Sequence, residues 1–322
     1  MQRIQSNRFS GSDWLRNCVI QAIALAPTPV AKFMSGMAFS LRSHRVNSLL
    51  PIAASYIAHK FSSRAAPIPN ARSKSSGFGG LVGEPSVEEM LAAYRKGFFP
   101  FAHLGPPKWM YSEHHTVLFF DEANCEKHTK RFLRNSRFDV SINKSFSQVM
   151  QACAAPRASK FVLTWITPGI MKLFQKLHDA GYAHSVEVWD KEGNLVGGLF
   201  GVAIGKIFFT ESQFHFVSGT SKVAFAVLNR HLAHWGYAMN DGKDWSKYLD
   251  AHGFRILHSD DYQKILDQHT QGPAAKEIWE IDDSIQWKDW QGEFDCQYPG
   301  ENLAPFDETS GQLLQSGEEM KW

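Results

Sequence analysis

Two carboxylates in the middle of the chain have the setting of a reactive site. Glu211 follows the apolar run Ile207-Phe208-Phe209 after one intervening residue, Thr210, and Asp241 closes the next expected strand, 237–241. Each carboxylate is therefore expected at the end of a strand, and both lie at one edge of the sheet if the strands are neighbours. Paired carboxylates beside an apolar wall can hold a cationic amine or tune a proton transfer. The alternative is a pair of solvated acids, and the spacing alone does not separate the two.

Other patterns that could carry chemistry are weaker. His231 and His234 lie three positions apart on an expected helix, but no third ligand has suitable spacing, so no metal site is predicted. The glycines of "GGLFGVAIG" (197–205) fall inside a strand pattern, which favours close backbone approach or a bulge over a phosphate-binding loop. No nucleophile elbow is present. Phe101 and Trp165 are either core residues or a platform for a ligand.

Caps and periodicity predict the elements that position these residues. Ser86 and Glu89 form a capping box that opens a helix, and Thr167-Pro168 opens another, while 98–109 reads as an aromatic and proline loop. The order after Pro168 is helix, three strands, helix, strand, helix, strand, helix, at 168–180, 184–189, 195–205, 206–214, 221–235, 237–241, 245–253, 254–258 and 259–269. This order is typical of an α+β fold with a mixed, mostly antiparallel sheet and packed helices.

Composition supports a globular protein with differently charged ends. Of the 322 residues, 43% are hydrophobic, yet apolar runs reach only about ten residues, which predicts no membrane span. The four cysteines are scattered without a CxxC pair, which favours a reducing compartment. Residues 1–76 hold ten Lys/Arg and one acid, whereas 267–322 hold three Lys and thirteen acids. The basic segment is a targeting peptide, a contact for phosphate backbones or anionic membranes, or an unstructured extension.

A long ordered pattern covers residues from about Gly77 to Leu266. It includes "TWITPGIMKLFQKLHDAGYAHSVEVWDKEGNLVGGLFGVAIGKIFFTESQF" (164–214), Ser221-Lys222, and "EEMLAAYRKGFFPF" (88–101). In these motifs the sequence resembles the leucyl/phenylalanyl-tRNA–protein transferase family. The resemblance implies an acetyltransferase-like (GNAT) mixed sheet flanked by helices, with a small N-terminal domain. The expected divisions are a basic extension and linker, the small domain, a GNAT-like catalytic domain and an acidic tryptophan-containing tail, at 1–76, 77–150, 151–269 and 270–322.

The resemblance also implies the activity and its partners. Such a transferase moves Leu, Phe or a related aminoacyl group from aminoacyl-tRNA to a protein with N-terminal Arg or Lys, which creates an N-degron for protein degradation. No cofactor and no metal are expected, and the enzyme is expected to be a cytoplasmic monomer. Two alternatives remain open: another acyltransferase on the same fold, and a non-catalytic homologue that binds tRNA or peptides.

Carried over by position, the resemblance implies a set of site residues. Phe101, Trp165 and Phe208 would line the site for the aminoacyl group and the terminal adenosine. Glu211, Asp241 and Lys243 would form the catalytic group, with Glu211 at the aminoacyl group or acceptor amine and Asp241 orienting the acceptor. The remaining substrate-binding residues would be Ser212, Gln213, Phe214 and His215.

The sequence departs from the family pattern within this set. Thr210, Gln213 and His215 replace Gly, Met and Ser, and Lys243 replaces a Gln that is one of the family's proposed catalytic groups. A protonated Lys243 would pair with Asp241 and repel a cationic acceptor, whereas a buried neutral Lys243 would accept a proton. A more polar pocket at Gln213 would alter the choice of amino acid.

Overall fold

The computed structural model describes residues 77–102, 106–112, 114–120, 133, 137–155, 164–272, 274 and 276–285. The predicted basic extension, most of the predicted acidic tail and three of the four cysteines lie outside these residues; the fourth, Cys153, is buried and free. None of the helices within the described ranges has the length and hydropathy needed to cross a bilayer.

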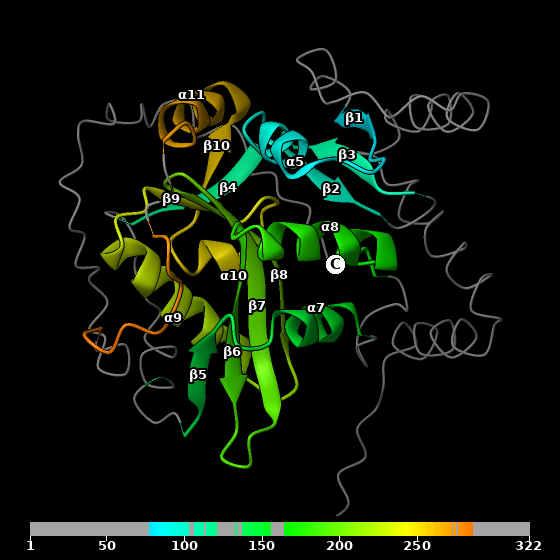
Figure 1. Ribbon diagram of the computed structural model, residues 1–322. Coiled ribbons are helices and arrows are strands. Elements are labelled where there is room, and N and C mark those ends of the chain that lie inside the picture. Colours follow the sequence, from blue (N-terminus) through cyan, green and yellow to red (C-terminus); the bar gives the residue numbers. More distant parts are fainter. Residues whose placement is uncertain are drawn as a thin grey trace, which may run out of the picture.

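A seven-stranded sheet forms the centre of the described structure, in the order β10-β4-β9-β8-β7-β6-β5 (Figure 1). Neighbouring strands are antiparallel except β8 and β9, which are parallel. The predicted α+β class with a mixed, mostly antiparallel sheet is therefore confirmed. In chain order the strands are β4 His114–Phe119, β5 Asp139–Ile142, β6 Ala183–Trp189, β7 Leu195–Ile204, β8 Ile207–His215, β9 Met239–Asp241 and β10 Arg255–His258.

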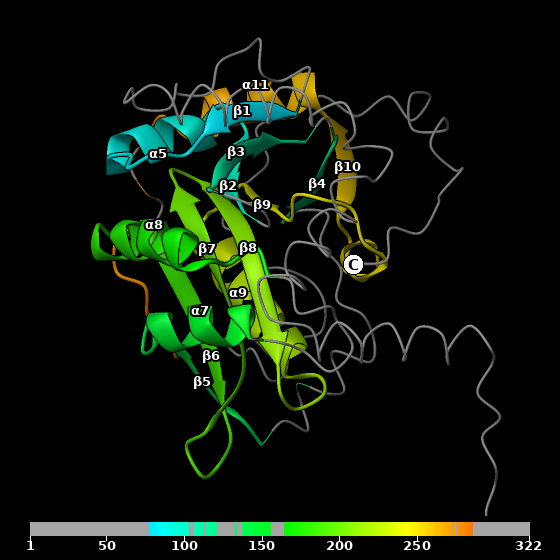
Figure 2. The same cartoon turned by 90° about the vertical axis from the view of Figure 1, so that its right-hand side faces the viewer.

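Helices cover both faces of this sheet, which gives the described part of the chain two hydrophobic cores. The helices α7 (Phe146–Ala154) and α8 (Pro168–Asp179) pack on one face, and α9 (Thr220–His234) packs on the other (Figure 2). Along β8 the side chains alternate between the two cores, because Phe209 packs with α7 and α8 whereas Phe208 packs with α9. Alternate residues of β8 therefore face opposite sides of the sheet.

A smaller three-stranded sheet lies near the top of Figure 1, above α8 and the upper ends of β7 and β8. Its order is β1-β3-β2, from Phe78–Leu81, Lys108–Tyr111 and Phe98–Phe101, and α5 (Val87–Tyr94) packs beside it. The prediction of a loop over 98–109 was wrong at both ends, where β2 and β3 form. Pro100 fits within β2 because β2 is an edge strand, where a missing N–H is tolerated.

The predicted helix starts are confirmed by their caps. Ser86 Oγ accepts from the Glu89 N–H while the Glu89 carboxylate accepts from the Ser86 N–H, which is the reciprocal capping box. Thr167 Oγ1 accepts from the Ile170 N–H ahead of Pro168 in the first helical position. The helix α11 spans Ser259–His269 as predicted, while α10 is shorter than predicted, at Lys247–Asp250.

The predicted domain boundary at residue 150 does not coincide with a break between secondary-structure elements. The strands β4 and β5 come from the predicted small domain but pair within the seven-stranded sheet, and α7 continues across residue 150. A division into separately folding domains stays a prediction.

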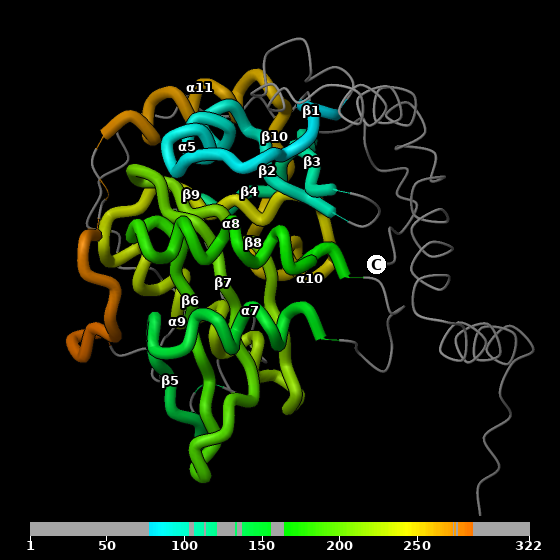
Figure 3. Tube along the Cα trace, turned by 45° about the vertical axis from the view of Figure 1, so that its right-hand side comes forward, coloured from blue at the N-terminus to red at the C-terminus, as the bar shows by residue number. Residues whose placement is uncertain are grey.

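The described part of the predicted tail, drawn in orange in Figure 3, packs on the α9 face. Trp279 is 6% exposed, stacks on His184 with ring centroids 3.8 Å apart, and lies 5.6 Å from the ring of Phe208. This segment therefore completes the second hydrophobic core.

Candidate active site

A β-bulge positions Glu211. Across β7 and β8, Gly201 pairs with Thr210 and Phe200 pairs with Ser212, so Glu211 is an extra residue with no partner on β7. Glu211 does not lie at the end of its strand as expected, because β8 continues to His215, one residue beyond the predicted strand 206–214. Gly201 permits this geometry, since a Cβ there would collide with the carbonyl oxygen of Phe209. The glycine pattern, read from the sequence as close approach or a bulge, has that function here.

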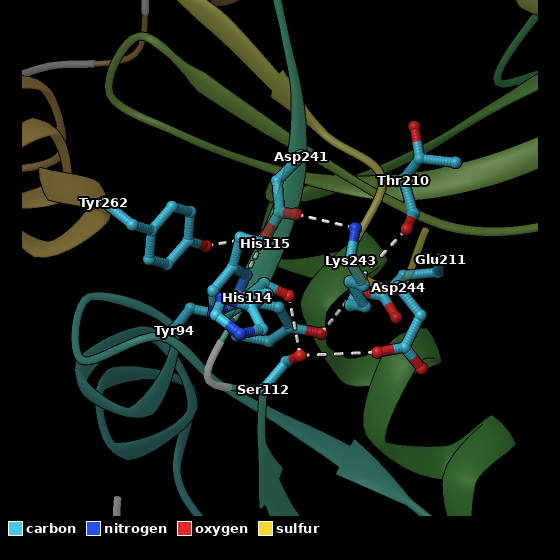
Figure 4. Close-up of polar contacts among 10 residues, drawn as sticks. All are labelled: Tyr94, Ser112, His114, His115, Thr210, Glu211, Asp241, Lys243, Asp244 and Tyr262. Carbon is cyan, nitrogen blue, oxygen red and sulfur yellow. Dashed lines mark hydrogen bonds and ion pairs between the residues drawn. The ribbon is translucent and has the colours of Figure 1, made fainter. Parts of the chain in front are cut away.

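The Glu211 carboxylate is buried and held by two groups. Its Oε1 accepts a hydrogen bond of 2.7 Å from the Tyr94 hydroxyl and lies 2.8 Å from Lys243 Nζ (Figure 4). The side chain is 1% exposed, and Oε2 is buried without a hydrogen-bond partner among the described residues. Burial raises the pKa of Glu211 above its ordinary value, although the neighbouring Lys243 opposes the shift. Glu211 is thus an interior carboxylate and not a solvated acid.

Asp241 lies at the end of β9, the parallel neighbour of β8. In the strand register Asp241 pairs with Phe209, two residues before Glu211, so the two strands bring both carboxylates to one region as expected. Asp241 Oδ2 accepts from the Tyr262 hydroxyl at 2.6 Å, and Oδ1 accepts from the Lys243 N–H at 2.7 Å. Burial alone would raise the pKa of Asp241, but its neighbours, His115 first, hold that pKa below the ordinary value.

His115 joins the site from β4, and the sequence reading did not include it. Its ring stacks on Tyr262 with centroids 3.6 Å apart and planes 7° from parallel. Its Nδ1 lies 3.5 Å from Asp241 Oδ2, an electrostatic contact that is too long for a good hydrogen bond. Only the pairing of β4 with β9 brings it there, since 126 positions separate His115 from Asp241.

Lys243 connects the two carboxylates. Its ammonium pairs with Glu211 and donates to the Thr210 carbonyl oxygen at 2.9 Å, while its backbone N–H donates to the Asp241 carboxylate. The expectation that the ammonium pairs with Asp241 was therefore wrong. The backbone φ of Lys243 is 64°, in the left-handed region that residues other than glycine seldom adopt.

An aromatic face of β2 borders this polar cluster. Phe99 and Phe101 are both half-buried and point the same way, two residues apart along the strand. Lys243 Nζ lies 5.6 Å from the ring centroid of Phe99. Phe101 stacks with Trp165, with centroids 5.8 Å apart and planes 13° from parallel. The face of β2 thus runs from the carboxylate cluster to a pair of parallel, half-buried aromatic rings.

The other predicted residues divide between the two faces of the sheet. Ser212 lies opposite Phe200 and Phe214 is 1% exposed in the core, both on the side that includes Phe209. Phe208, Gln213 and His215 are on the α9 side: Phe208 and the cross-strand partner of Gln213, Leu199, belong to the second core. The sheet therefore does not bring these three side chains to Glu211 and Asp241.

The α9 side has a hollow of its own at the end of β8. A pocket of about 260 Å³ is lined by Gln213, His215, Ser218, Gly219, Ser221, Lys222 and Tyr248. His231 and His234 are farther along α9, where His231 hydrogen-bonds to the Val227 carbonyl and to the Asp282 N–H. Within the described ranges, no group of three or more His, Cys, Asp or Glu side chains could hold a metal ion.

Comparisons with known proteins identify similar sequences. The sequence profile described as "Leucyl/phenylalanyl-tRNA protein transferase" matches residues 117–267. A protein of that name from Pseudomonas fluorescens (strain SBW25) is 39% identical over 208 residues, which cover 64% of this chain and 91% of the relative. One from Azotobacter vinelandii is 39% identical over 210 residues, covering 65% and 92%. Among solved structures, "Crystal structure of FemX" aligns with a TM-score of 0.36 and 12% identity over 69% of this chain and 79% of that one.

Proposed function

The chain belongs to the leucyl/phenylalanyl-tRNA–protein transferase family, and we propose that it transfers Leu, Phe or a related aminoacyl group from aminoacyl-tRNA to the N-terminal amine of a protein. The proposed acceptors include proteins that begin with Arg or Lys, and the new N-terminus directs them to degradation. The observation that carries this proposal is the 39% identity over 91% of a relative's length. The range matched by the family profile, 117–267, contains the positions of Glu211, Asp241 and Lys243.

The reaction is the aminolysis of an ester. The acceptor nitrogen attacks the ester carbonyl carbon, a C–N bond forms, and the bond from that carbon to the ribose oxygen breaks. The amine loses one proton, and the ribose oxygen leaves as a hydroxyl. At pH 7 an α-amine with a pKa of about 7.7–8.0 is roughly 10–15% neutral, so deprotonation is worth only about tenfold. Positioning is worth more, up to about 7–11 kcal/mol.

The aromatic face of β2 is the proposed donor site. Phe101 and Trp165 are half-buried parallel rings, which suits stacking with the terminal adenosine of the tRNA. Lys and Arg side chains would bind the phosphate backbone without reading the bases. Ser212 and Phe214 lie on the side of the large sheet that includes Phe209, and we assign them to the aminoacyl pocket.

The carboxylate cluster is the proposed acceptor site. Asp241 is fixed by Tyr262 and the Lys243 N–H, which makes it a rigid group for orienting the acceptor amine. Glu211 Oε2 is the buried oxygen without a partner among the described groups, and a substrate N–H is proposed to donate to it. Lys243 holds Glu211 in place through Oε1.

The finer architecture and setting belong to the same proposal. A GNAT-like catalytic unit over 151–269 would carry the acceptor chemistry, and the 77–150 segment would supply the donor platform on β2. The enzyme would work as a cytoplasmic monomer without a cofactor. The mixed sheet with helices on both faces supports the GNAT-like part of this proposal.

Transfer of label tests the proposal. Purified protein is incubated with radiolabelled Leu-tRNA or Phe-tRNA and a peptide that begins with Arg, and label in the peptide is counted. We expect time-dependent transfer. A binding protein without transfer activity is the second candidate, because the Lys243 ammonium already neutralises Glu211; binding of charged tRNA with no transfer to any acceptor would favour it.

A further inference from the structure

Lys243 is an internal cation placed at a carboxylate of the proposed acceptor site. Its Nζ lies 2.8 Å from Glu211 Oε1, and the two side chains are only 11% and 1% exposed. We infer that Lys243 determines acceptor selectivity: it neutralises Glu211, so the enzyme accepts N-terminal residues with uncharged side chains as readily as Arg or Lys. This inference rests on the proposed transferase function and concerns the same site.

The second carboxylate does not offer an unpaired charge either. Asp241 accepts hydrogen bonds from Tyr262 and from the Lys243 N–H, and His115 Nδ1 lies 3.5 Å from its Oδ2. A carboxylate with both oxygens engaged has little capacity left for a bidentate guanidinium. The site therefore presents hydrogen-bond acceptors to an amine but not a free anion to a basic side chain.

The ammonium of Lys243 is held firmly in this position. Beyond the Glu211 contact, Nζ donates to the Thr210 carbonyl oxygen at 2.9 Å. The backbone is fixed on both sides, because the Thr116 N–H donates to the Lys243 carbonyl and the Gly242 N–H donates to the Thr116 carbonyl, each at 2.8 Å. An arriving guanidinium or ammonium therefore meets a like charge that cannot easily move away.

The charges that face the pair explain the expected selectivity. Glu211 and Asp241 contribute two negative charges and Lys243 returns one positive charge, with His115 beside Asp241. A like charge placed at a binding site weakens the binding of one class of partner, so it removes the preference that two unpaired carboxylates would give to a basic side chain. An uncharged first side chain avoids this repulsion and still presents the α-amine.

Two peptides that differ only in charge test the inference. One begins with Arg and the other with citrulline, the uncharged analogue of Arg, and both receive labelled Phe from Phe-tRNA. The proteins compared are the wild type, Lys243→Gln, and Lys264→Gln, which breaks an exposed Lys–Asp pair of the same 2.8 Å length on α11. The measured quantity is the ratio of kcat/KM for the Arg peptide to kcat/KM for the citrulline peptide.

We expect the wild-type ratio to lie within about threefold of one, and Lys243→Gln to raise it by at least about tenfold while Lys264→Gln leaves it unchanged. A wild-type ratio above about tenfold overturns the inference without any variant, even if Lys243→Gln fails to fold. An unchanged ratio in an active Lys243→Gln variant overturns it as well. Absence of transfer to both peptides in all three proteins refutes the proposed function itself, which is a different result.

Discussion

Replacing Glu211 with Ala should destabilise the protein strongly, because it leaves the Lys243 ammonium buried without its counter-ion. At 2.8 Å and an effective dielectric constant of about 20, the gross attraction of the pair is about 6 kcal/mol. Desolvation offsets part of that attraction, and removing one partner of a buried pair costs about 3–5 kcal/mol in net stability. The Tyr94 hydroxyl loses its acceptor in the same variant.

The assays are urea unfolding, which gives the free energy of unfolding, and thermal unfolding, which gives Tm. Both are applied to wild type, Glu211→Ala, Lys243→Met and the double variant. We expect Glu211→Ala to lower the free energy of unfolding by about 3–5 kcal/mol and Tm by about 10 °C. The double variant should lose less than the sum of the single losses, because neither charge is left alone. Asp139→Ala is the matched control: it breaks a 2.8 Å pair with Lys191 whose side chains are 63% and 58% exposed, at a cost below about 1 kcal/mol.

Two outcomes would contradict this reasoning. The first is a Glu211→Ala protein within about 1 kcal/mol of wild type, a cost expected of an exposed pair and not of a buried one. The second is a double variant whose loss equals the sum of the two single losses, since the cycle would then report no coupling.

Three further predictions concern separate parts of the site. The folded-state pKa of Asp241 lies below its ordinary value of 3.8. The ionised carboxylate therefore stabilises the fold above about pH 4, and this stabilisation is lost as pH falls through the folded-state pKa. The difference in free energy of unfolding between wild type and Asp241→Asn should therefore narrow on acidification below about pH 4. Phe101→Ala should reduce kcat/KM for charged tRNA by about 5–150-fold, as expected for about 1–3 kcal/mol of base stacking, with unfolding little changed; Phe216→Ala, at an exposed ring, should not. Gly201→Ala should cost at least about 2 kcal/mol in urea unfolding because the bulge has no room for a Cβ, whereas Gly272→Ala, in open space, should cost little.

Each of these has an outcome that would count against it. A stability gap at Asp241→Asn that widens on acidification would mean that the folded-state pKa of Asp241 lies above its ordinary value. Equal tRNA kinetics for Phe101→Ala and Phe216→Ala would remove the stacking role. Equal stabilities of the two glycine variants would mean that the bulge adjusts to a side chain.

Local signals allowed most of the helices and strands to be predicted from the sequence. The capping box at Ser86 and the Thr167-Pro168 start depend on residues within one turn of each other, so their structural consequence is visible in the sequence. The α+β class followed from the order of those elements. The strands β2 and β3 were missed because the prolines within 98–109 are typical of a loop, and only the position of β2 at a sheet edge makes Pro100 acceptable in a strand.

The candidate site could be predicted only in part, because its decisive contacts are long-range. Glu211 and Asp241 were identified from the strands that carry them, but the bulge at Glu211 depends on how β7 pairs with β8. Tyr94 lies 117 positions from Glu211, and no local pattern indicates that its hydroxyl reaches the carboxylate. The assignment of Phe208, Gln213 and His215 to the same pocket neglected the alternation of side chains along a strand, which places them on the α9 side.

The central claim is that this cluster supports the transfer of an aminoacyl group to an N-terminal amine. Mass spectrometry of an acceptor peptide, after incubation with the protein and a panel of charged tRNAs, tests it most directly. The account predicts a product longer by one Leu or Phe residue at the α-amine, formed by wild type and strongly reduced in a folded Asp241→Asn variant. An unmodified peptide with every charged tRNA, from folded wild-type protein, would contradict it.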